Sequence, residues 1–145
     1  YGSVFKVFLK QKLENTPLTI VGDGIQTRDF TYVTDVVKAN LIAAESDING
    51  EIINIGTGNP QSVNYLAKLI GGSTESIPKR PGEPDSTNAD ISKAKELLKW
   101  EPKMTFEAGV KIMLENIEYW KDAPLWTPEK IGEATKSWFK YLKKD

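Results

Sequence analysis

Two arginines lie in turn-rich segments where they could bind an anionic ligand. Arg28 follows a glycine-rich turn, and Arg80 is followed directly by a proline and a glycine. A guanidinium presents a rigid fork of N–H donors that fits a phosphate group, and its charge strengthens those hydrogen bonds. Glu83 could accept hydrogen bonds from sugar hydroxyls. The alternative is that each arginine pairs with a surface carboxylate and that Glu83 is simply solvated, as exposed glutamates usually are.

A second glycine-rich turn could in principle bind a dinucleotide. An apolar run ends at Gly56-Thr57-Gly58, which superficially matches the start of the G-x-G-x-x-G fingerprint. The third glycine of that fingerprint, which allows the helix and the strand to pack closely, is replaced by Gln61. We therefore interpret the segment as a tight strand-to-helix turn beside a ligand and expect no cofactor-binding residue in this chain.

Three aspartates near turns, Asp29, Asp35 and Asp90, invite a catalytic interpretation. Helix capping or hydrogen bonding to backbone N–H groups explains all three more simply. The rings of Phe30 and Tyr32 alternate on an extended segment, so one could face a ligand, but core burial is the simpler expectation. Structural roles are therefore predicted for these residues.

The composition excludes several classes of site and partner. The 145 residues include no cysteine and no histidine, which rules out disulfides, thiolate metal sites and the usual zinc and copper ligand sets. The 19 basic and 20 acidic residues form no long block of one sign, so a nucleic-acid partner is not expected. No apolar run reaches the roughly 20 residues that span a bilayer. We expect one compact, cytoplasmic unit with no metal and no membrane contact.

Alternating strands, turns and helices must position these side chains. Apolar spacing predicts a first helix over Val4 to Leu13, and β-branched residues predict a strand over Leu18 to Val21. Extended segments are expected at 28–33 and 51–55, with a loop at 76–84. Five further helices are expected to start at or just after Asp35, Ser62, Asp90, Thr105 and Thr127. The pattern predicts an α/β fold of short strands with packed helices and a largely helical C-terminal third.

The last predicted helix carries an apolar stripe that is expected to be core. The stripe consists of Ile131, Ala134, Trp138 and Leu142. If the tryptophans of the tail instead form an exposed patch, they mark an interface, which leaves a helical interaction protein as an alternative. These tryptophans are Trp120, Trp126 and Trp138.

Four segments together resemble the nucleotide-sugar epimerases and dehydratases of the extended short-chain dehydrogenase/reductase type. They are residues 18–35, Asn-Ile-Gly-Thr-Gly at 54–58, Arg-Pro-Gly-Glu-Pro at 80–84 and Ala-Asp-Ile-Ser-Lys-Ala at 89–94, in the family's order and at about its spacing. The resemblance implies that residues 1–145 are the C-terminal substrate-binding part of such an enzyme. Tyr1 starts the chain inside an apolar-periodic segment, which is expected of a cut end. The resemblance implies that the N-terminal, NAD-binding Rossmann core of the family is absent from this chain.

The resemblance also implies roles for single residues. Arg28 and Arg80 are expected to contact the diphosphate of a nucleotide-sugar, Glu83 its ribose hydroxyls, and Thr87 is expected to line the sugar pocket. Glu83 departs from the family, in which aspartate is commoner at this position. The family's catalytic Tyr-x-x-x-Lys pair is missing, because none of the five tyrosines has a lysine four positions later. We therefore expect no catalytic residue in this chain, with NAD bound by the missing part.

The expected function is nucleotide-sugar binding within an NAD-dependent epimerase that resembles the UDP-glucose and UDP-N-acetylglucosamine 4-epimerases. Residues 80–84 lack the Gly-His-Asp that 4,6-dehydratases of this family tend to carry, which favours an epimerase over a dehydratase. A non-catalytic nucleotide-sugar binding module is the other alternative. Without a Rossmann core the chain should be inactive alone and should expose apolar surface, so a homo-oligomer is an expected partner beside the nucleotide-sugar.

Overall fold

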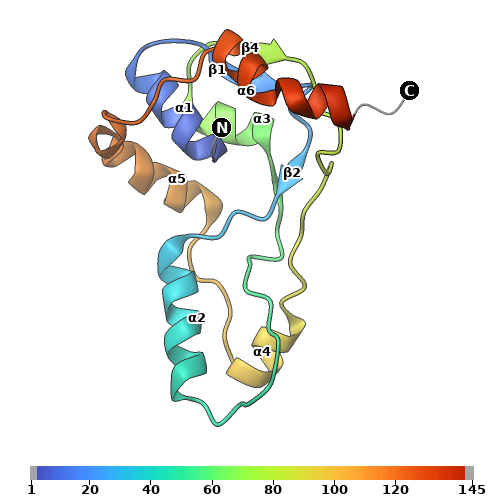
Figure 1. Ribbon diagram of the computed structural model, residues 1–145. Helices are drawn as coiled ribbons and strands as arrows, with labels where there is room; N and C mark the ends of the chain where they lie inside the picture. Colours follow the sequence, from blue (N-terminus) through green and yellow to red (C-terminus); the bar gives the residue numbers. More distant parts are fainter. Residues whose placement is uncertain (1–2, 143–145) are drawn as a thin grey trace. The chain divides into compact units, whose positions relative to one another are not determined.

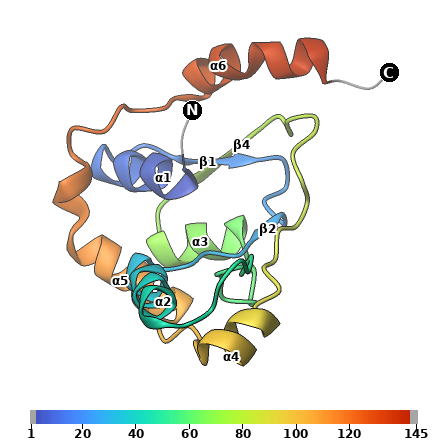
Figure 2. The same cartoon turned by 60° about the horizontal axis from the view of Figure 1, so that its bottom comes forward.

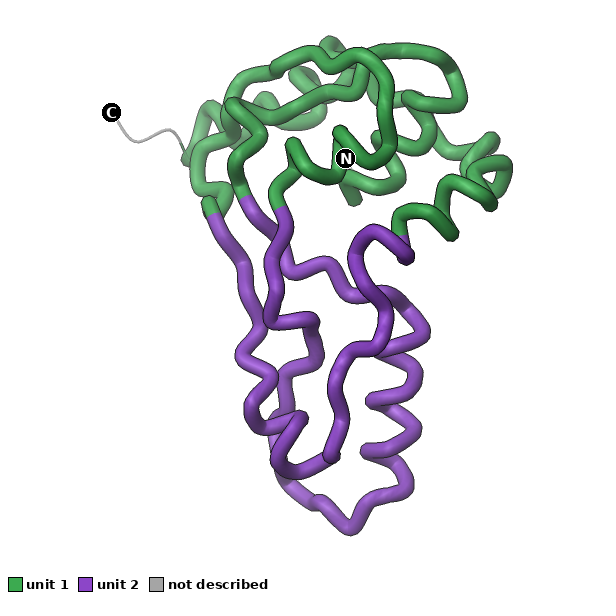
Figure 3. The backbone as a smooth tube through the Cα atoms, turned by 180° about the vertical axis from the view of Figure 1, so that it is seen from behind, with its two compact units in different colours: residues 1–26, 62–85, 110–145 green, residues 27–61, 86–109 purple. Residues whose placement is uncertain are grey.

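The chain passes back and forth between two structural units in the computed structural model, which describes residues 3–142. Unit 1 is formed by residues 1–26, 62–85 and 110–145, and unit 2 by residues 27–61 and 86–109 (Figure 3). The expectation of a single compact unit is therefore wrong. The two units are each built from segments far apart in the sequence, so no linker marks their boundary. The prediction about Tyr1 lies outside the described residues.

Two parallel strands form the centre of unit 1. β1 (Leu18–Val21) pairs with β4 (Thr74–Ile77), with Leu18 opposite Thr74 and Val21 opposite Ile77. All four residues of β1 are buried, whereas only Ile77 is buried in β4. The first strand was predicted, but β4 was not, because its exposed polar residues lack the apolar alternation by which a strand is recognised.

Helices cover both faces of this strand pair within unit 1 (Figures 1 and 2). α1 (Val4–Leu13) and α3 (Val63–Ile70) lie on one face, and α6 (Pro128–Tyr141) lies on the other. The large side chains of the core include the fully buried Phe8, Leu9, Leu18 and Leu66. On the opposite face, Ile131 of α6 forms a smaller cluster with Val21 and Ile77. Burial on both faces explains why β1 is apolar at nearly every position.

A buried glutamine ties the parts of unit 1 together. The Gln11 amide donates to Thr19 Oγ1 at 3.0 Å and to the Trp126 carbonyl at 2.8 Å, and its oxygen accepts from the Thr19 N–H at 3.1 Å. Gln11 is only 1% exposed, so these bonds satisfy a polar group that would otherwise be costly to bury. The bonds fix the segment leading into α6 relative to α1 and β1.

The helix ends in unit 1 follow the capping residues that the sequence offers. The Ser62 side chain accepts from the Tyr65 N–H, and the Thr127 side chain accepts from the Lys130 N–H, as predicted for both. α3 ends at Gly71, whose φ of +73° is a left-handed conformation that glycine adopts without strain. α5 (Phe106–Glu115) enters unit 1 from unit 2 and is followed by a 3-10 helix, η1 (Ile117–Trp120).

Unit 2 is built around the contact between α2 (Val33–Glu45) and α4 (Ser92–Leu98). Its core cluster consists of Ala39, Ile91, Ala94, Leu98 and Trp100. β2 (Thr27–Arg28) and β3 (Gln61–Ser62) form a second two-stranded sheet.

The strand expected at 51–55 is not formed. Among residues 3–142, no strand pairs with this segment, and Ile52 is 88% exposed. The extended segment expected at 28–33 is also shorter than predicted, since β2 ends at Arg28 and α2 already begins at Val33. An apolar run therefore becomes a strand only where the fold supplies a partner with hydrogen-bonding groups. None of the helices between residues 3 and 142 has the length and apolar character needed to cross a membrane.

Candidate functional site

Arg80 and Glu83 form a close, partly buried ion pair in unit 1. Arg80 Nε donates to one carboxylate oxygen of Glu83 at 3.0 Å, and Nη2 donates to the other at 2.9 Å. The two side chains are only 13% and 20% exposed. A two-point fork of this kind fixes the guanidinium plane as well as its position. The structure thus brings together two of the predicted site residues. It also shows that Arg80 pairs with a carboxylate, which was the alternative expectation for this arginine.

A tryptophan stacks against the same guanidinium. Arg80 Cζ lies 5.5 Å from the centroid of the Trp138 ring, which is within range of a cation–π contact. Trp138 is 41% exposed, so the prediction that it belongs to the core is wrong. Trp120 and Trp126 are half-buried, so the tail tryptophans do not form one exposed patch either. The apolar stripe of the last helix predicted that Trp138 faces the core, but nothing in the sequence indicated Arg80 as its neighbour.

The hollow beside Glu83 is small. Its volume is about 10 Å³, enough for one water and far below the few hundred Å³ that enclose a small-molecule ligand. Next to it, Lys79 and Asp85 form an exposed ion pair at 2.5 Å, which raises the pKa of Lys79 through the hydrogen bond and the charge of Asp85. The hollow is lined by Val21, Gln26, Lys79, Glu83, Pro84 and Asp85.

Arg28 and Thr87, the other two predicted site residues, meet at one backbone carbonyl in unit 2. The carbonyl of Thr27 accepts from Arg28 Nη1 at 2.7 Å and from the Thr87 N–H at 3.2 Å. Thr27 also forms an isolated parallel β-bridge with Ser86. The Thr27 hydroxyl donates to Ser86 Oγ at 2.8 Å. These bonds hold the start of the 86–89 segment against β2. Thr87 itself is exposed.

Asp29 is a backbone clamp, as predicted from its position. Its carboxylate accepts from the backbone N–H of Thr57 at 2.8 Å, of Gly58 at 2.9 Å and of Ala89 at 3.1 Å, and from the Thr57 hydroxyl. Partial burial raises the pKa of Asp29, but the hydrogen bonds from Thr57, Ala89 and Gly58 together outweigh it, so the pKa lies below its ordinary value. The aspartate is thus held as an anion that joins three segments of unit 2.

The Gly56-Thr57-Gly58 turn does not fit the diphosphate of NAD. A helix N-terminus binds phosphate through its free N–H groups, but here the N–H groups of Thr57 and Gly58 donate to Asp29. A Cβ added at Gly56 would lie 2.4 Å from the Ala89 Cβ and 2.8 Å from Asp29 Oδ2, so the glycine is required for close packing. The segment is therefore a tight turn, as expected, but it is not the strand-to-helix turn that was predicted, because the strand expected at 51–55 is not formed.

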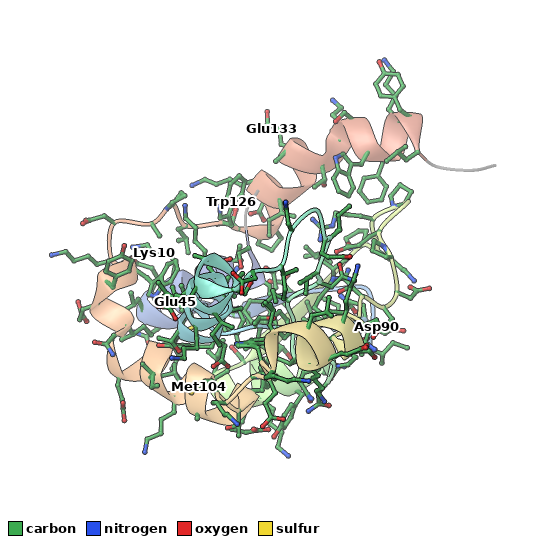
Figure 4. All side chains as sticks on the ribbon, turned by 90° about the horizontal axis from the view of Figure 1, so that it is seen from below. Lys10, Glu45, Asp90, Met104, Trp126 and Glu133 are labelled. Carbon is green, nitrogen blue, oxygen red and sulfur yellow. The ribbon has the colours of Figure 1, made fainter. Side chains whose placement is uncertain are left out.

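The other two aspartates also bind backbone N–H groups. Asp35 was expected to cap α2 from outside, but the helix begins at Val33, and the buried Asp35 carboxylate accepts from the N–H of Lys103 at 3.1 Å and of Met104 at 2.9 Å. Asp90, labelled at the start of α4 in Figure 4, accepts from the Ser92 N–H at 2.9 Å. Hydrogen bonding to Ser92 lowers the pKa of Asp90. Both aspartates therefore have structural partners.

Phe30, which follows β2, lines a hollow in unit 2. Phe30 stacks on Phe106, with ring centroids 5.2 Å apart. The Tyr32 ring packs against Gly109, where an added Cβ would lie 3.0 Å from Tyr32 Cδ2. Phe30 and Phe106 border a hollow of about 280 Å³ together with Thr57, Asn59 and residues 102–107. Phe30 and Tyr32 are both half-buried, so the expectation of core burial for these two residues is met only in part.

Comparison with known proteins identifies the family. The family model described as GDP-mannose 4,6 dehydratase matches residues 3–113. A UDP-glucuronate 4-epimerase of Thermodesulfobacterium geofontis is 42% identical over 80% of this chain and 39% of the relative. A UDP-N-acetyl-alpha-D-glucosaminuronate decarboxylase of Bacillus cytotoxicus is 33% identical over 84% of this chain and 41% of the relative.

A solved structure gives the same result for the fold. The crystal structure of UDP-glucuronic acid 4-epimerase from Bacillus cereus, in complex with UDP-glucuronic acid and NAD, superposes with a TM-score of 0.75 at 37% identity. The match covers 81% of this chain and 40% of that enzyme, so the chain spans about two-fifths of the length of the relatives it matches. The chain belongs to the family of NAD-dependent nucleotide-sugar epimerases and dehydratases that the GDP-mannose 4,6 dehydratase model represents.

Proposed function

We propose that this chain is the nucleotide-sugar-binding part of an NAD-dependent epimerase that acts at C4 of a UDP-sugar. The observation that carries the proposal is the geometry of Arg80, which lies in the loop after β4. Its partly buried guanidinium is fixed by two hydrogen bonds to Glu83. An arginine fixed in this way loses little side-chain freedom when it binds phosphate, so more of the contact energy appears as affinity. The relatives with UDP-glucuronic acid and epimerase in their names support this choice of ligand and reaction.

Each predicted site residue has a defined part in the proposal. Arg80 would bind the diphosphate, and Glu83 would both orient Arg80 and accept from the ribose hydroxyls, because a carboxylate can accept more than the two bonds that Arg80 donates. Arg28 is proposed to contact the diphosphate and Thr87 to line the sugar pocket. Binding energy from these contacts would position the sugar for reaction, which is a large part of enzymatic rate.

NAD is proposed to bind outside the residues of this chain. In the G-x-G sequence at 56–58, the N–H groups of Thr57 and Gly58 donate to Asp29, and no tyrosine in the sequence has a lysine four positions later. We propose no catalytic residue in this chain. A dehydratase would use the same nucleotide contacts and differ in chemistry performed elsewhere, so the nucleotide contacts alone do not separate the two reactions.

Calorimetric titration of the chain with UDP, UDP-glucuronic acid, UDP-N-acetylglucosamine and dTDP-glucose tests the proposal. Arg80→Ala should weaken binding by about 1.5–3 kcal/mol, the worth of a hydrogen bond to a charged group. The matched control is Lys79→Ala, which removes one positive charge from the neighbouring exposed residue and leaves the Glu83 fork intact. The control should change affinity by well under about 1 kcal/mol.

Two outcomes would contradict the proposal. Equal losses in Arg80→Ala and Lys79→Ala would mean that only net charge matters, and the arginine fork would not be the binding group. Absence of any titration heat with a well-folded chain would mean that these residues do not form a nucleotide site by themselves. Substitution of Arg28 and Thr87, one at a time, then tests the remaining two assignments in the same assay.

A further inference from the structure

The C-terminal helix α6 lies beyond residues 3–113, the segment that matches the family model. It is nevertheless an integral part of unit 1. Ile131 is 2% exposed and packs against Val21 and Ile77, and Thr135 is 4% exposed with its hydroxyl bonded to the Ile131 carbonyl. The helix is therefore anchored on the strand pair from which the Arg80 loop departs.

One face of α6 contacts both the strand pair and the loop that carries Arg80. Positions 131, 135, 138 and 142 are spaced by four, three and four residues, so they share a helical face. Beyond the buried Ile131 and Thr135, Trp138 stacks on Arg80 and Leu142 lies against Gly82, where an added Cβ would be 3.4 Å from Leu142 Cδ1. The loop is thus contacted twice by the same helix.

Arg80 is consequently held by two side chains, one from its own loop and one from α6. Glu83 fixes the guanidinium plane through the fork, and the Trp138 ring provides a cation–π contact with Cζ at 5.5 Å. A local fork between residues three positions apart can tilt as a unit with its loop. A ring mounted on a packed helix does not tilt with that loop, because α6 is anchored separately at Ile131.

We propose that Trp138 is a positioning residue for the nucleotide site and that α6 is the element through which it acts. It orients Arg80 toward the diphosphate without contacting the ligand itself. The inference rests on the proposed function for the role of Arg80, and it adds a residue outside the part of the chain that the family model covers.

The test combines nucleotide affinity with a direct probe of Arg80 in the 145-residue chain. Trp138→Ala should weaken UDP binding about two- to fivefold, the factor that corresponds to one exposed cation–π contact. Trp138→Phe, which keeps an aromatic face, should restore most of the affinity. Glu133→Ala is the matched control, because Glu133 is exposed on α6 and points away from the strands in Figure 4. It should leave affinity unchanged.

A double-mutant cycle shows whether Trp138 acts through Arg80. In an Arg80→Ala background, Trp138→Ala should cause no further loss of affinity, whereas additive losses would overturn the inference. The Arg80 Nε–H resonance provides the second readout, because a stacked tryptophan ring shifts it and removal of the ring should return it toward the position of a solvated arginine.

The two readouts separate this inference from the proposed function. If the unsubstituted chain binds no nucleotide, the proposed function fails, and the positioning of Arg80 is then decided by the Nε–H resonance alone. A resonance that is the same in the Trp138→Ala variant overturns the inference. A loss of affinity in Trp138→Ala that Trp138→Phe does not restore also overturns it, since the helix face and not the ring would then be responsible.

Discussion

At the scale of single residues, aspartates near turns hold the backbone together. Asp29 joins the turn at 57–58 to Ala89, and Asp35 holds the N–H groups of Lys103 and Met104. The sequence predicts this type of role because aspartates near turns usually bind backbone N–H groups. It does not predict the partners, because these lie between 28 and 69 residues away along the chain. The four site residues were named from the sequence, but their neighbours Trp138 and Thr27 were not.

The Asp29 clamp makes stability depend on pH in a defined direction. Its pKa in the folded state is below the ordinary 3.8, so its contribution is complete above that value and is lost as pH falls through the folded pKa. Asp29→Asn should lower the free energy of unfolding by about 1–3 kcal/mol near neutral pH, because backbone N–H groups lose their anionic acceptor.

Urea denaturation at a series of pH values checks this. The difference between the unsubstituted chain and Asp29→Asn should shrink as the pH drops below about 4. Asp90→Asn is the comparison, since Asp90 is exposed and its carboxylate binds only the nearby Ser92 among the described residues. It should cost less than Asp29→Asn at neutral pH. A pH-independent difference for Asp29→Asn would show that the loss comes from replacing an acceptor oxygen with an amide NH2 group and not from the charge.

Close packing at Gly56 leads to a second prediction at this scale. A methyl group there would overlap the Ala89 Cβ and the Asp29 carboxylate, so Gly56→Ala should destabilise the chain by about 1–3 kcal/mol. The midpoint of urea unfolding measures the effect. If Gly56→Ala leaves the urea midpoint unchanged, Ala89 can move away from the added methyl group. The 86–89 segment would then not be fixed by this contact.

At the scale of elements, structure that depends on nearby residues was predicted well from the sequence. Structure that depends on residues far along the chain was not. α1, α3 and α6 appear where apolar spacing and the caps Ser62 and Thr127 place them, because a helix satisfies its own hydrogen bonds. β4 was missed, and the segment 51–55 was wrongly expected to be a strand. A strand needs a partner, and sequence pattern alone does not say whether one is present.

A substitution in α6 tests whether its middle part is helical in solution. Gly132 lies in its interior, and a Cβ added there meets nothing within 4 Å. Because glycine has more conformational freedom to lose than alanine, Gly132→Ala should stabilise the chain by about 0.5–1 kcal/mol. Thermal unfolding should show a higher midpoint. A decrease would mean that this part of α6 departs from helical geometry in solution.

At the scale of the whole molecule, the interleaving of the two units could not be read from the sequence. The chain changes unit after residues 26, 61, 85 and 109, and no linker long enough to mark a boundary lies at these points. The units are defined by contacts between distant segments, such as β1 with β4 in unit 1 and α2 with α4 in unit 2. The alternation of strand and helix predicted the α/β class, whereas the division into units required the structure.

An apolar row on α2 leads to the last prediction, which concerns assembly. Val33, Val37 and Leu41 are 64%, 50% and 54% exposed, and their spacing of four residues places them on one side of the helix. Exposed apolar rows of this kind mark interaction surfaces or cause self-association. Since the chain spans only about two-fifths of its relatives, we expect it to self-associate through this row when studied alone.

Sedimentation at increasing concentration tests this expectation with a pair of charge substitutions. Val37→Lys combined with Leu41→Lys should shift the chain toward monomer, because an interface containing these side chains would have to bury two unpaired charges. Asn49→Lys, in the exposed turn after α2, controls for added charge and should leave association as it is. Unchanged association in the double variant would exclude the α2 row as the contact. A monomer at all concentrations without any substitution would remove the basis for a homo-oligomer formed by these residues.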